Sequence, residues 1–400
     1  MSRHLKDIIG FLVIIIVCLE TVHASSLDDY FDSVSGVIPN TIKFSVSQEA
    51  MYRDNINSSP DKKDAFEFVT GLTANWMRTF SNLMYGVEGK VEYTYLTEEP
   101  ESSQDGLEWS LNPKIIGSET FHITTYDRVM VSLNSSSSKE KWDDFDSEYV
   151  RRTYYRGNIV YDLIGLHRIG FTTTLYYHNL KYDDKDYKDY SRQRYGFSVS
   201  PYYKLTHRIR TGIRFEHTET EYINDKRRDD STKIGIFSFA NYMITARVNA
   251  TLQAGLTRID YEGRSKDSDN SGEFVKEYSF RMSYAPTDKT HFIVRSVFQN
   301  DDTYDTNRGC RYEWDNFFIW VWEFTSRFSL DNTFGIENKD EKNKNTRDVT
   351  EYSYKCRLTY DLTSKCSVFT GYEMNNLRYK YRKEKDYTEN VFRLGFSYHF

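Results

Sequence analysis

The sequence has little proline, little cysteine and no long hydrophobic run after its first 20 residues. A membrane-spanning helix needs about 20 mainly apolar residues, so a bundle of such helices is excluded. Only 6 prolines in 400 residues leave β-strands uninterrupted. The cysteines after residue 24 are odd in number, which argues against a disulfide framework. They are Cys310, Cys356 and Cys366, and we expect Cys356 and Cys366 to be small lipid-facing side chains.

The first 24 residues have the pattern of a secretory signal peptide. Arg3 and Lys6 form a short cationic region, an apolar run of about 12 residues follows at 8–19, and Ala24 offers a cleavage site before Ser25. We therefore expect a cleaved signal peptide at 1–24 and a short periplasmic segment at 25–40.

The rest of the chain is rich in aromatic residues and yet polar. It contains most of 33 tyrosines and 26 phenylalanines, while the mean hydropathy of the whole chain is −0.69. A transmembrane β-barrel has this composition, because only alternate residues meet lipid and the loops are charged. The net charge of −6 is mild, so no nucleic-acid partner is expected.

Polar, charged segments recur about every forty residues, and a shorter break lies between each pair of them. This alternation of long and tight connections is typical of outer-membrane barrels, which have long outer loops and short periplasmic turns. A β-propeller also repeats about every forty residues, but its blades hold four short strands, whereas each repeat here has room for two long ones. The charged segments centre on Ser58, Glu101, Glu140, Lys185, Lys226, Asp267, Asp302, Asn343 and Lys385.

Between the breaks, apolar and polar residues alternate with the period of two that a β-strand requires. Residues 83–95, 209–216, 248–256, 274–284 and 352–360 each have one apolar face and one charged or hydroxylated face. The alternation is interrupted at Asp127, Phe237, Phe239, Ile259 and Tyr261. A β-bulge after Leu256 is one explanation for Ile259 and Tyr261.

The chain ends on an alternating strand whose apolar face is almost wholly aromatic. A free edge of this kind invites aggregation in a soluble protein, whereas a closed barrel pairs it with the first strand and turns its apolar face to lipid. We expect this face to be the barrel-assembly signal. It consists of Phe392, Leu394, Phe396, Tyr398 and Phe400.

Nine hairpins of this kind predict an all-β, antiparallel transmembrane barrel of about 18 strands at residues 41–400, with an uncertainty of two strands. An even count places both chain ends on the periplasmic side and closes the last strand against the first. Aromatic residues near the strand ends are expected to form interfacial belts. They are Tyr202, Tyr203, Tyr242, Tyr284 and Tyr360, with Trp76, Trp314, Trp320 and Trp322 on the apolar parity.

No catalytic or metal-binding motif stands out. The histidines have neither the spacing of a metal site nor a neighbouring nucleophile motif, so neither an enzyme nor a cofactor is expected. The candidate functional residues are instead charged side chains on the polar face of the strands, which is predicted to line the lumen. There they would either pair with one another and stabilise the barrel, or set the electric field that acts on a solute. They are Arg194, Arg210, Arg214, Glu216, Glu277, Arg281, Lys355, Arg357 and Arg393.

Four segments share one sequence pattern, in which a tyrosine is followed by a short turn with threonine, a basic or polar residue and an alternating strand. In this pattern the chain resembles a beta-barrel porin family of Gram-negative outer membranes that is associated with exopolysaccharide and exosortase gene clusters. The resemblance extends from about residue 42 onward. The segments are YKLTHRIRTGIRFEHTE from Tyr203, YMITARVNATLQAGLTRIDYEG from Tyr242, YAPTDKTHFIVRSVF from Tyr284 and YDLTSKCSVFTGYEMNN from Tyr360.

The resemblance implies an outer-membrane channel, with export of a secreted exopolysaccharide as the expected function. Two alternatives stay open, an uptake porin and a non-conducting surface barrel. The implied partners are outer-membrane lipid and lipopolysaccharide, the barrel-assembly machinery, a polysaccharide substrate and a separate periplasmic export partner, because this chain has no helical-repeat periplasmic arm.

Overall fold

The computed structural model describes a single closed antiparallel sheet of 18 strands. The described residues are 42–55, 63–80, 83–97, 106–118, 127–141, 149–166, 168–183, 185–223, 230–262, 272, 274–302, 310–341, 348–381 and 383–400. The predicted signal peptide and periplasmic segment lie outside them. Among the described residues, no helix is long and apolar enough to cross a membrane.

The strands run in chain order around the barrel, and each pairs with its sequence neighbours. The first nine are β1 (Ile42–Arg53), β2 (Ala65–Phe80), β3 (Leu83–Leu96), β4 (Gly106–Ser118), β5 (Asp127–Lys141), β6 (Tyr149–Leu166), β7 (Ile169–Tyr182), β8 (Arg192–Lys204) and β9 (Ile209–Tyr222). The others are β10 (Ser231–Thr245), β11 (Val248–Tyr261), β12 (Phe274–Thr287), β13 (Thr290–Asp302), β14 (Cys310–Thr325), β15 (Phe328–Glu341), β16 (Val349–Asp361), β17 (Cys366–Tyr379) and β18 (Tyr387–His399). Among the described residues, the short 3₁₀ helices η1 (Lys185–Tyr190) and η3 (Lys383–Lys385) lie in connections between strands.

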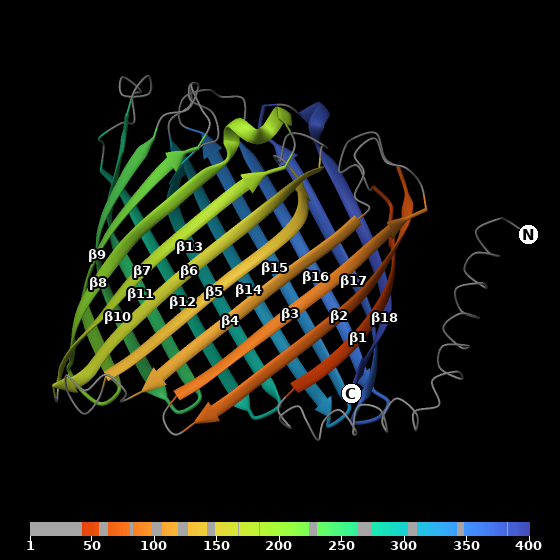
Figure 1. Cartoon of the computed structure of the whole chain (residues 1–400), viewed down its shortest axis with the longest axis horizontal. Coiled ribbons are helices and arrows are strands. Elements are labelled where there is room, and N and C mark those ends of the chain that lie inside the picture. The colour runs from red at the N-terminus through yellow and green to blue at the C-terminus, as the bar shows by residue number, and fades with distance from the viewer. Residues whose placement is uncertain are drawn as a thin grey trace, which may run out of the picture.

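The barrel closes where the last strand meets the first. β1 pairs with β2 on one side and with β18 on the other, and the register places Ser45 opposite His399 and Arg53 opposite Val391. We call this pairing the seam. Figure 1 shows β1 and β18 side by side, with all strands inclined to the barrel axis. The prediction of 18 strands and of an end-to-start closure is confirmed.

Among the described residues, several short turns lie at the end of the barrel that holds the C-terminus (Figure 1), and five of them share one hydrogen bond. Residues 246 and 247 alone separate β10 from β11, whereas residues 262–273 separate β11 from β12 at the other end. In five of the short turns a threonine Oγ1 accepts a hydrogen bond from the backbone N–H of a basic residue two positions later, a local turn-forming contact. The pairs are Thr206 with Arg208, Thr245 with Arg247, Thr287 with Lys289, Thr325 with Arg327 and Thr363 with Lys365, at 3.1–3.2 Å.

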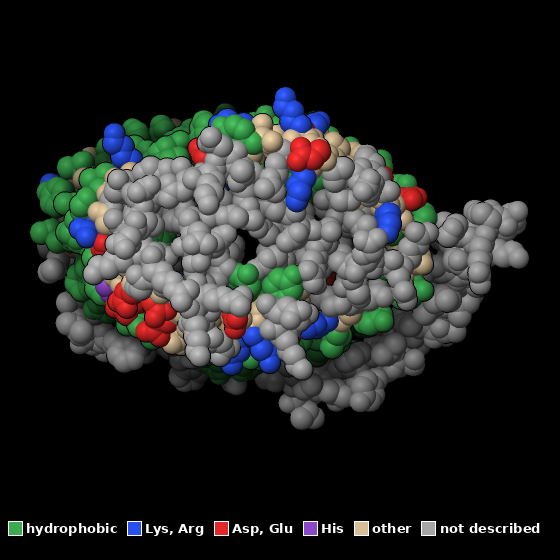
Figure 2. Space-filling view, turned by 90° about the horizontal axis from the view of Figure 1, so that it is seen from above, with side chains coloured by type: hydrophobic (Ala, Val, Ile, Leu, Met, Phe, Trp, Pro, Cys, Tyr) green, Lys and Arg blue, Asp and Glu red, His purple; other side chains and the backbone are tan. Residues whose placement is uncertain are grey.

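The outer face of the barrel carries the apolar parity that the sequence predicts. Phe392 and Leu394 are 53% and 64% exposed, and Trp314 and Trp322 also point outward. In the end-on view, hydrophobic side chains gather along the perimeter (Figure 2). Exposed apolar surface on this scale is stable only against another apolar phase, here the hydrocarbon of a bilayer.

Tyr202 does not belong to the interfacial belt in which the sequence placed it. The outward Tyr203, Tyr242 and Tyr284 are each at least 40% exposed, but Tyr202 is 4% exposed. It lies at an inward position, and its hydroxyl donates a hydrogen bond to the Leu163 carbonyl oxygen. A strand places successive side chains on opposite faces, so Tyr202 and Tyr203 cannot both face lipid.

The other parity breaks are inward apolar residues and not bulges. β11 keeps an unbroken register with β10 through Ile259 and Tyr261, so the predicted bulge after Leu256 is absent. Phe237 is 3% exposed and covers Gly255, where an added Cβ would lie 2.6 Å from the Phe237 Cα and Cδ1 atoms. An aromatic ring that covers a glycine recurs at Phe239 with Gly212, Phe317 with Gly335 and Phe369 with Gly395. The side chain of Asp127 is outside the described residues.

Cys356 and Cys366 are free and lie on the outward parity of β16 and β17. Their placement agrees with small side chains on the lipid face. The side chain of Cys310 is outside the described residues.

Candidate functional site: the barrel lumen

All nine charged residues that the sequence selects lie at inward positions of the barrel. Arg194 is on β8, Arg210, Arg214 and Glu216 on β9, Glu277 and Arg281 on β12, Lys355 and Arg357 on β16, and Arg393 on β18. Their role toward a solute stays a prediction. The structure shows different contacts for them in different parts of the barrel.

At the seam, an arginine from the first strand bridges two buried carboxylates. The Arg53 Nε donates to Glu67 on β2 at 2.7 Å, and its Nη1 donates to Glu389 on β18 at 3.1 Å. The carboxylates are 6% and 4% exposed as residues. Charges buried this deeply are stable only when paired, so this bridge holds the first and last strands together.

Arg393 extends the seam network toward β17. Its guanidinium donates to Glu49 on β1 at 3.1 Å and to Glu373 on β17 at 2.8 Å. Lys355 on β16 also contacts Glu373, at 2.8 Å. These two candidate residues therefore neutralise carboxylates of neighbouring strands.

Glu277 is the centre of a buried clamp rather than part of an open surface. Its Oε1 accepts hydrogen bonds from Lys233 Nζ (2.9 Å), the Thr257 hydroxyl (2.7 Å) and the Asn300 backbone N–H (3.0 Å). Lys233 also donates to the Asn300 carbonyl oxygen at 2.7 Å. Four successive strands, β10 to β13, are tied together at this carboxylate, which is 8% exposed as a residue.

We call the inward residues of β6 to β10 the basic wall, because cations outnumber carboxylates there. Arg214 pairs with Glu216 at 2.6 Å, and the Arg210 guanidinium lies 4.8 Å from the ring centre of Tyr202. The described cations are Arg152, Arg156, Arg192, Arg194, Lys204, Arg210, Arg214 and Lys233, and the described carboxylates are Asp162 and Glu216.

Across the lumen, the inward residues of β14 to β18 form what we call the acidic wall. In a ring of 18 strands, β17 lies opposite β8. A lumen with walls of opposite charge has a field directed across the pore, which orients a dipolar or charged solute. The described carboxylates are Glu313, Asp315, Glu323, Asp331, Glu337, Glu351, Asp361, Glu373 and Glu389, and the described cations are Lys339, Lys355, Arg357 and Arg393.

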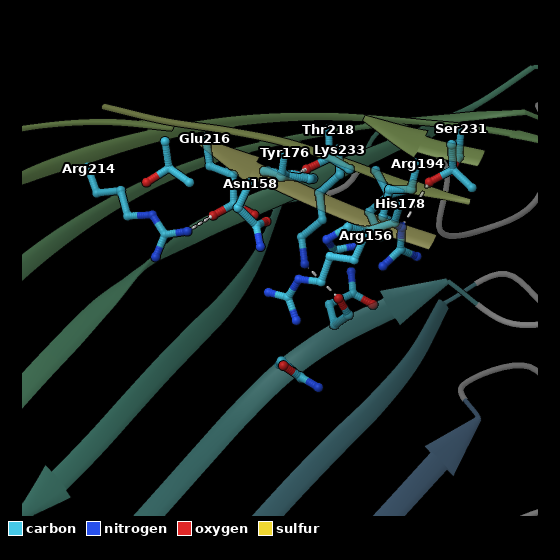
Figure 3. A pocket seen from close by; sticks show the side chains of 15 residues that line it. Arg156, Asn158, Tyr176, His178, Arg194, Arg214, Glu216, Thr218, Ser231 and Lys233 are labelled. Atoms are coloured by element: carbon cyan, nitrogen blue, oxygen red, sulfur yellow. Dashed lines mark hydrogen bonds and ion pairs between the residues drawn. The ribbon is translucent and has the colours of Figure 1, made fainter. Parts of the chain in front are cut away.

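A cavity of about 410 Å³ opens on the basic wall. Figure 3 shows Arg156, His178, Arg194 and Lys233 clustered in it, with the Arg214–Glu216 pair to one side. Sequence reasoning selected three of its residues, Arg194, Arg214 and Glu216, and missed the others. Parity alone would have placed Arg156 and Lys233 in the lumen, but which inward residues converge depends on strand tilt and register.

The comparisons with known proteins do not assign this chain to a family. No family model and no curated protein matches the chain. Among solved structures, the chain is similar to OccK9 (OpdG) of Pseudomonas aeruginosa (11% identity, TM-score 0.49, 90% of this chain and 98% of that one) and OpdQ of the same organism (12%, 0.47, 90% and 98%). It is also similar to the FrpB iron transporter (F3-3 variant) from Neisseria meningitidis (9%, 0.46, 92% and 83%). At these identities and TM-scores the likeness assigns neither family nor substrate.

The location follows from the barrel itself. Only helices and closed barrels satisfy all backbone hydrogen bonds in hydrocarbon, and this chain closes a barrel with an apolar outer face and a charged interior. Barrels of this size with an even strand count belong to bacterial outer membranes. The chain is therefore a β-barrel protein of a Gram-negative outer membrane.

Proposed function

We propose that this barrel is an aqueous channel, and that its cargo is a secreted exopolysaccharide on its way out of the cell. The observation that carries the channel is the closed 18-stranded barrel with a charged, hydroxylated inner face. Barrels of 16 to 18 strands leave an aqueous channel, whereas those of about 8 strands are filled by side chains.

The inward aromatic residues support an open path. Phe237, Phe239 and Phe369 each lie over a glycine of a paired strand. A ring that packs against the wall stays out of the middle of the lumen. The same large side chains, directed across the pore, would favour a plugged, non-conducting barrel.

The cargo proposal is supported by the sequence pattern that the four turn–strand segments share and by the chemistry of the lumen. Threonine and tyrosine hydroxyls, amides and guanidinium groups alternate along β6 to β9, as at Thr174, Tyr176, Arg194 and Thr218. These groups form hydrogen bonds with sugar hydroxyls, and they release them readily because water competes for each bond. A separate periplasmic partner would deliver the polymer.

Planar-bilayer recording tests the channel. The folded protein should conduct, and Arg210→Glu or Arg281→Glu should shift the reversal potential toward cation selectivity by a few-fold in permeability ratio, because each variant reverses one lumen charge. Arg258→Glu is the matched control, since Arg258 lies at an outward position of β11. Folded protein without conductance would contradict the proposal.

Deletion of the gene separates export from uptake. Loss of surface polysaccharide with normal growth on small solutes supports export. Normal polysaccharide with slower entry of small solutes supports an uptake porin instead.

A further inference from the structure

The basic-wall cavity has unpaired polar atoms as well as excess positive charge. Among the described residues, buried side-chain atoms without a hydrogen-bond partner include His178 Nε2, Arg214 Nε and both amide atoms of Asn300, and all three residues line this cavity. Asn300 is 1% exposed. A buried polar group without a partner destabilises the fold, so a concentration of such groups indicates a place where a ligand supplies the missing bonds.

The charges of the cavity define which ligand fits. Arg156, Arg194, Arg214 and Lys233 line it together with one carboxylate, Glu216, and Glu216 already pairs with Arg214. Lys233 is compensated from outside the cavity by Glu277. With four cations and one carboxylate, the lining of this cavity carries an excess of positive charge, which favours an anion.

The geometry also matches a single sugar unit better than a bare ion. A volume of about 410 Å³ is within the range of pockets that hold small organic ligands, ~300–1,000 Å³. The Tyr176 and Thr218 hydroxyls, which contact each other, and the hydroxyl of Thr174 offer hydrogen bonds to an uncharged part of the ligand. Guanidinium groups bind carboxylate and phosphate oxygens through two parallel hydrogen bonds.

We infer that this cavity is a binding subsite for an anionic sugar unit, with Arg156 and Arg194 holding its negatively charged group and Asn300 and Tyr176 contacting its hydroxyls. The inference rests on the proposed channel function in one respect, that solutes reach the lumen. It adds that acidic sugars are retained there and neutral sugars are not.

Calorimetric titration of the detergent-solubilised barrel tests the subsite without any transport. Glucuronate and glucose 6-phosphate are the two anionic probes, and glucose is the neutral one. We expect heat from at least one anion and none from glucose, and the stronger anion identifies a carboxylate or a phosphate as the preferred group. Equal responses to all three sugars, or no response to any, would overturn the inference.

Variants locate the binding. Arg156→Gln and Arg194→Gln should each weaken anion binding about tenfold, which corresponds to one charge-assisted hydrogen bond at 1.4 kcal/mol per tenfold. Arg258→Gln is the matched control, because Arg258 precedes the cavity residue Ile259 on β11 but points outward. Far-ultraviolet circular dichroism of each variant establishes that the barrel is folded. Unchanged affinity in folded Arg156→Gln and Arg194→Gln would place the site elsewhere and overturn the inference.

Bilayer recording distinguishes the failure of the subsite from the failure of the channel. If the protein conducts but binds no anion, the subsite is contradicted and the channel is supported. If the protein does not conduct but binds an anion, and Arg156→Gln weakens that binding, the subsite is supported and the channel is contradicted.

Discussion

The two walls of the lumen use the same kind of residue in different ways. On the acidic wall, Arg393 and Lys355 both contact Glu373, and Arg393 also reaches Glu49 across the seam. On the basic wall, Arg156 has the amide of Asn158 within hydrogen-bond distance, at 3.1 Å, and Arg210 lies over the ring of Tyr202. The first two cations hold neighbouring strands together, whereas the Arg156 contact stays within β6 and Arg210 lies on an aromatic ring.

The difference follows from the position of the seam. Every other pair of neighbouring strands is joined by a connection along the chain, but β1 and β18 are held only by the contacts between them. Ion pairs between partly buried groups are specific to one register, and the seam has them at Arg53 with Glu389 and Arg393 with Glu49. Strands β6 to β10 lie away from the seam, and each is joined to its neighbours by a connection along the chain.

The largest effect is expected at the seam. Arg53→Gln leaves Glu67 and Glu389 buried without a cation, and removal of one partner from a buried charge network costs about 3–5 kcal/mol. The free energy of unfolding in urea, measured with the barrel in lipid vesicles, should fall by that amount. A loss below about 1 kcal/mol would mean that the seam does not depend on this bridge. Arg378→Gln is the control, because its ion pair with Asp386 is outward and its side chain is 53% exposed.

A smaller loss of stability is expected from substitution of glycines that aromatic rings cover, and it should be similar at the seam and next to the basic wall. A Cβ at Gly255 would lie 2.6 Å from the Phe237 Cα, and one at Gly395 would lie 2.6 Å from the Gln48 carbonyl oxygen across the seam. Gly255→Ala and Gly395→Ala should each lower the free energy of unfolding by about 1–3 kcal/mol, the usual cost of overpacking. The same urea titration measures it.

Gly89→Ala is the control for these two variants. An added Cβ there would meet only the Leu111 Cδ1 atom, at 3.7 Å, so the free energy of unfolding should stay within about 0.5 kcal/mol of the unchanged protein. If only Gly395→Ala destabilises, packing as well as charge would distinguish the seam from the basic wall.

The period of two in the sequence predicts the strands and their number because lipid and water select residues on opposite faces. That selection acts only where a strand crosses hydrocarbon. Toward the end of β9 opposite the short turns, His217, Glu219 and Glu221 occupy outward positions and break the pattern. Inside, an apolar residue is also tolerated where it packs on the wall, so Phe237 and Ile259 looked irregular although the register is regular.

The candidate site was predictable residue by residue but not as an arrangement. Parity assigns Arg393 and Arg210 to the same class, and nothing in the sequence shows that one is held between Glu49 and Glu373 while the other stacks on Tyr202. Contacts between strands distant in sequence depend on register and tilt, which only the closed barrel fixes. For the same reason Asn300, on β13, could not be connected with Lys233, on β10.

The smallest effect, and the most direct test of the two-wall comparison, concerns Arg156. We expect that the Arg156 side chain is not needed for the stability of the barrel. Arg156→Gln removes like-charge repulsion, so it should leave the free energy of unfolding unchanged or raise it by up to about 0.5 kcal/mol. Any gain should be larger at ~0.01 M salt, where the Debye length is about 30 Å, than at ~1 M, where it is about 3 Å. Urea titration at the two salt concentrations measures this.

Arg258→Gln is the control. It should lose a little stability and show no such gain, because the Arg258 guanidinium lies 2.8 Å from the Asp260 carboxylate. A loss of more than about 1 kcal/mol in Arg156→Gln would show that both walls use their cations to hold the barrel, and the contrast between them would then lie only in net charge.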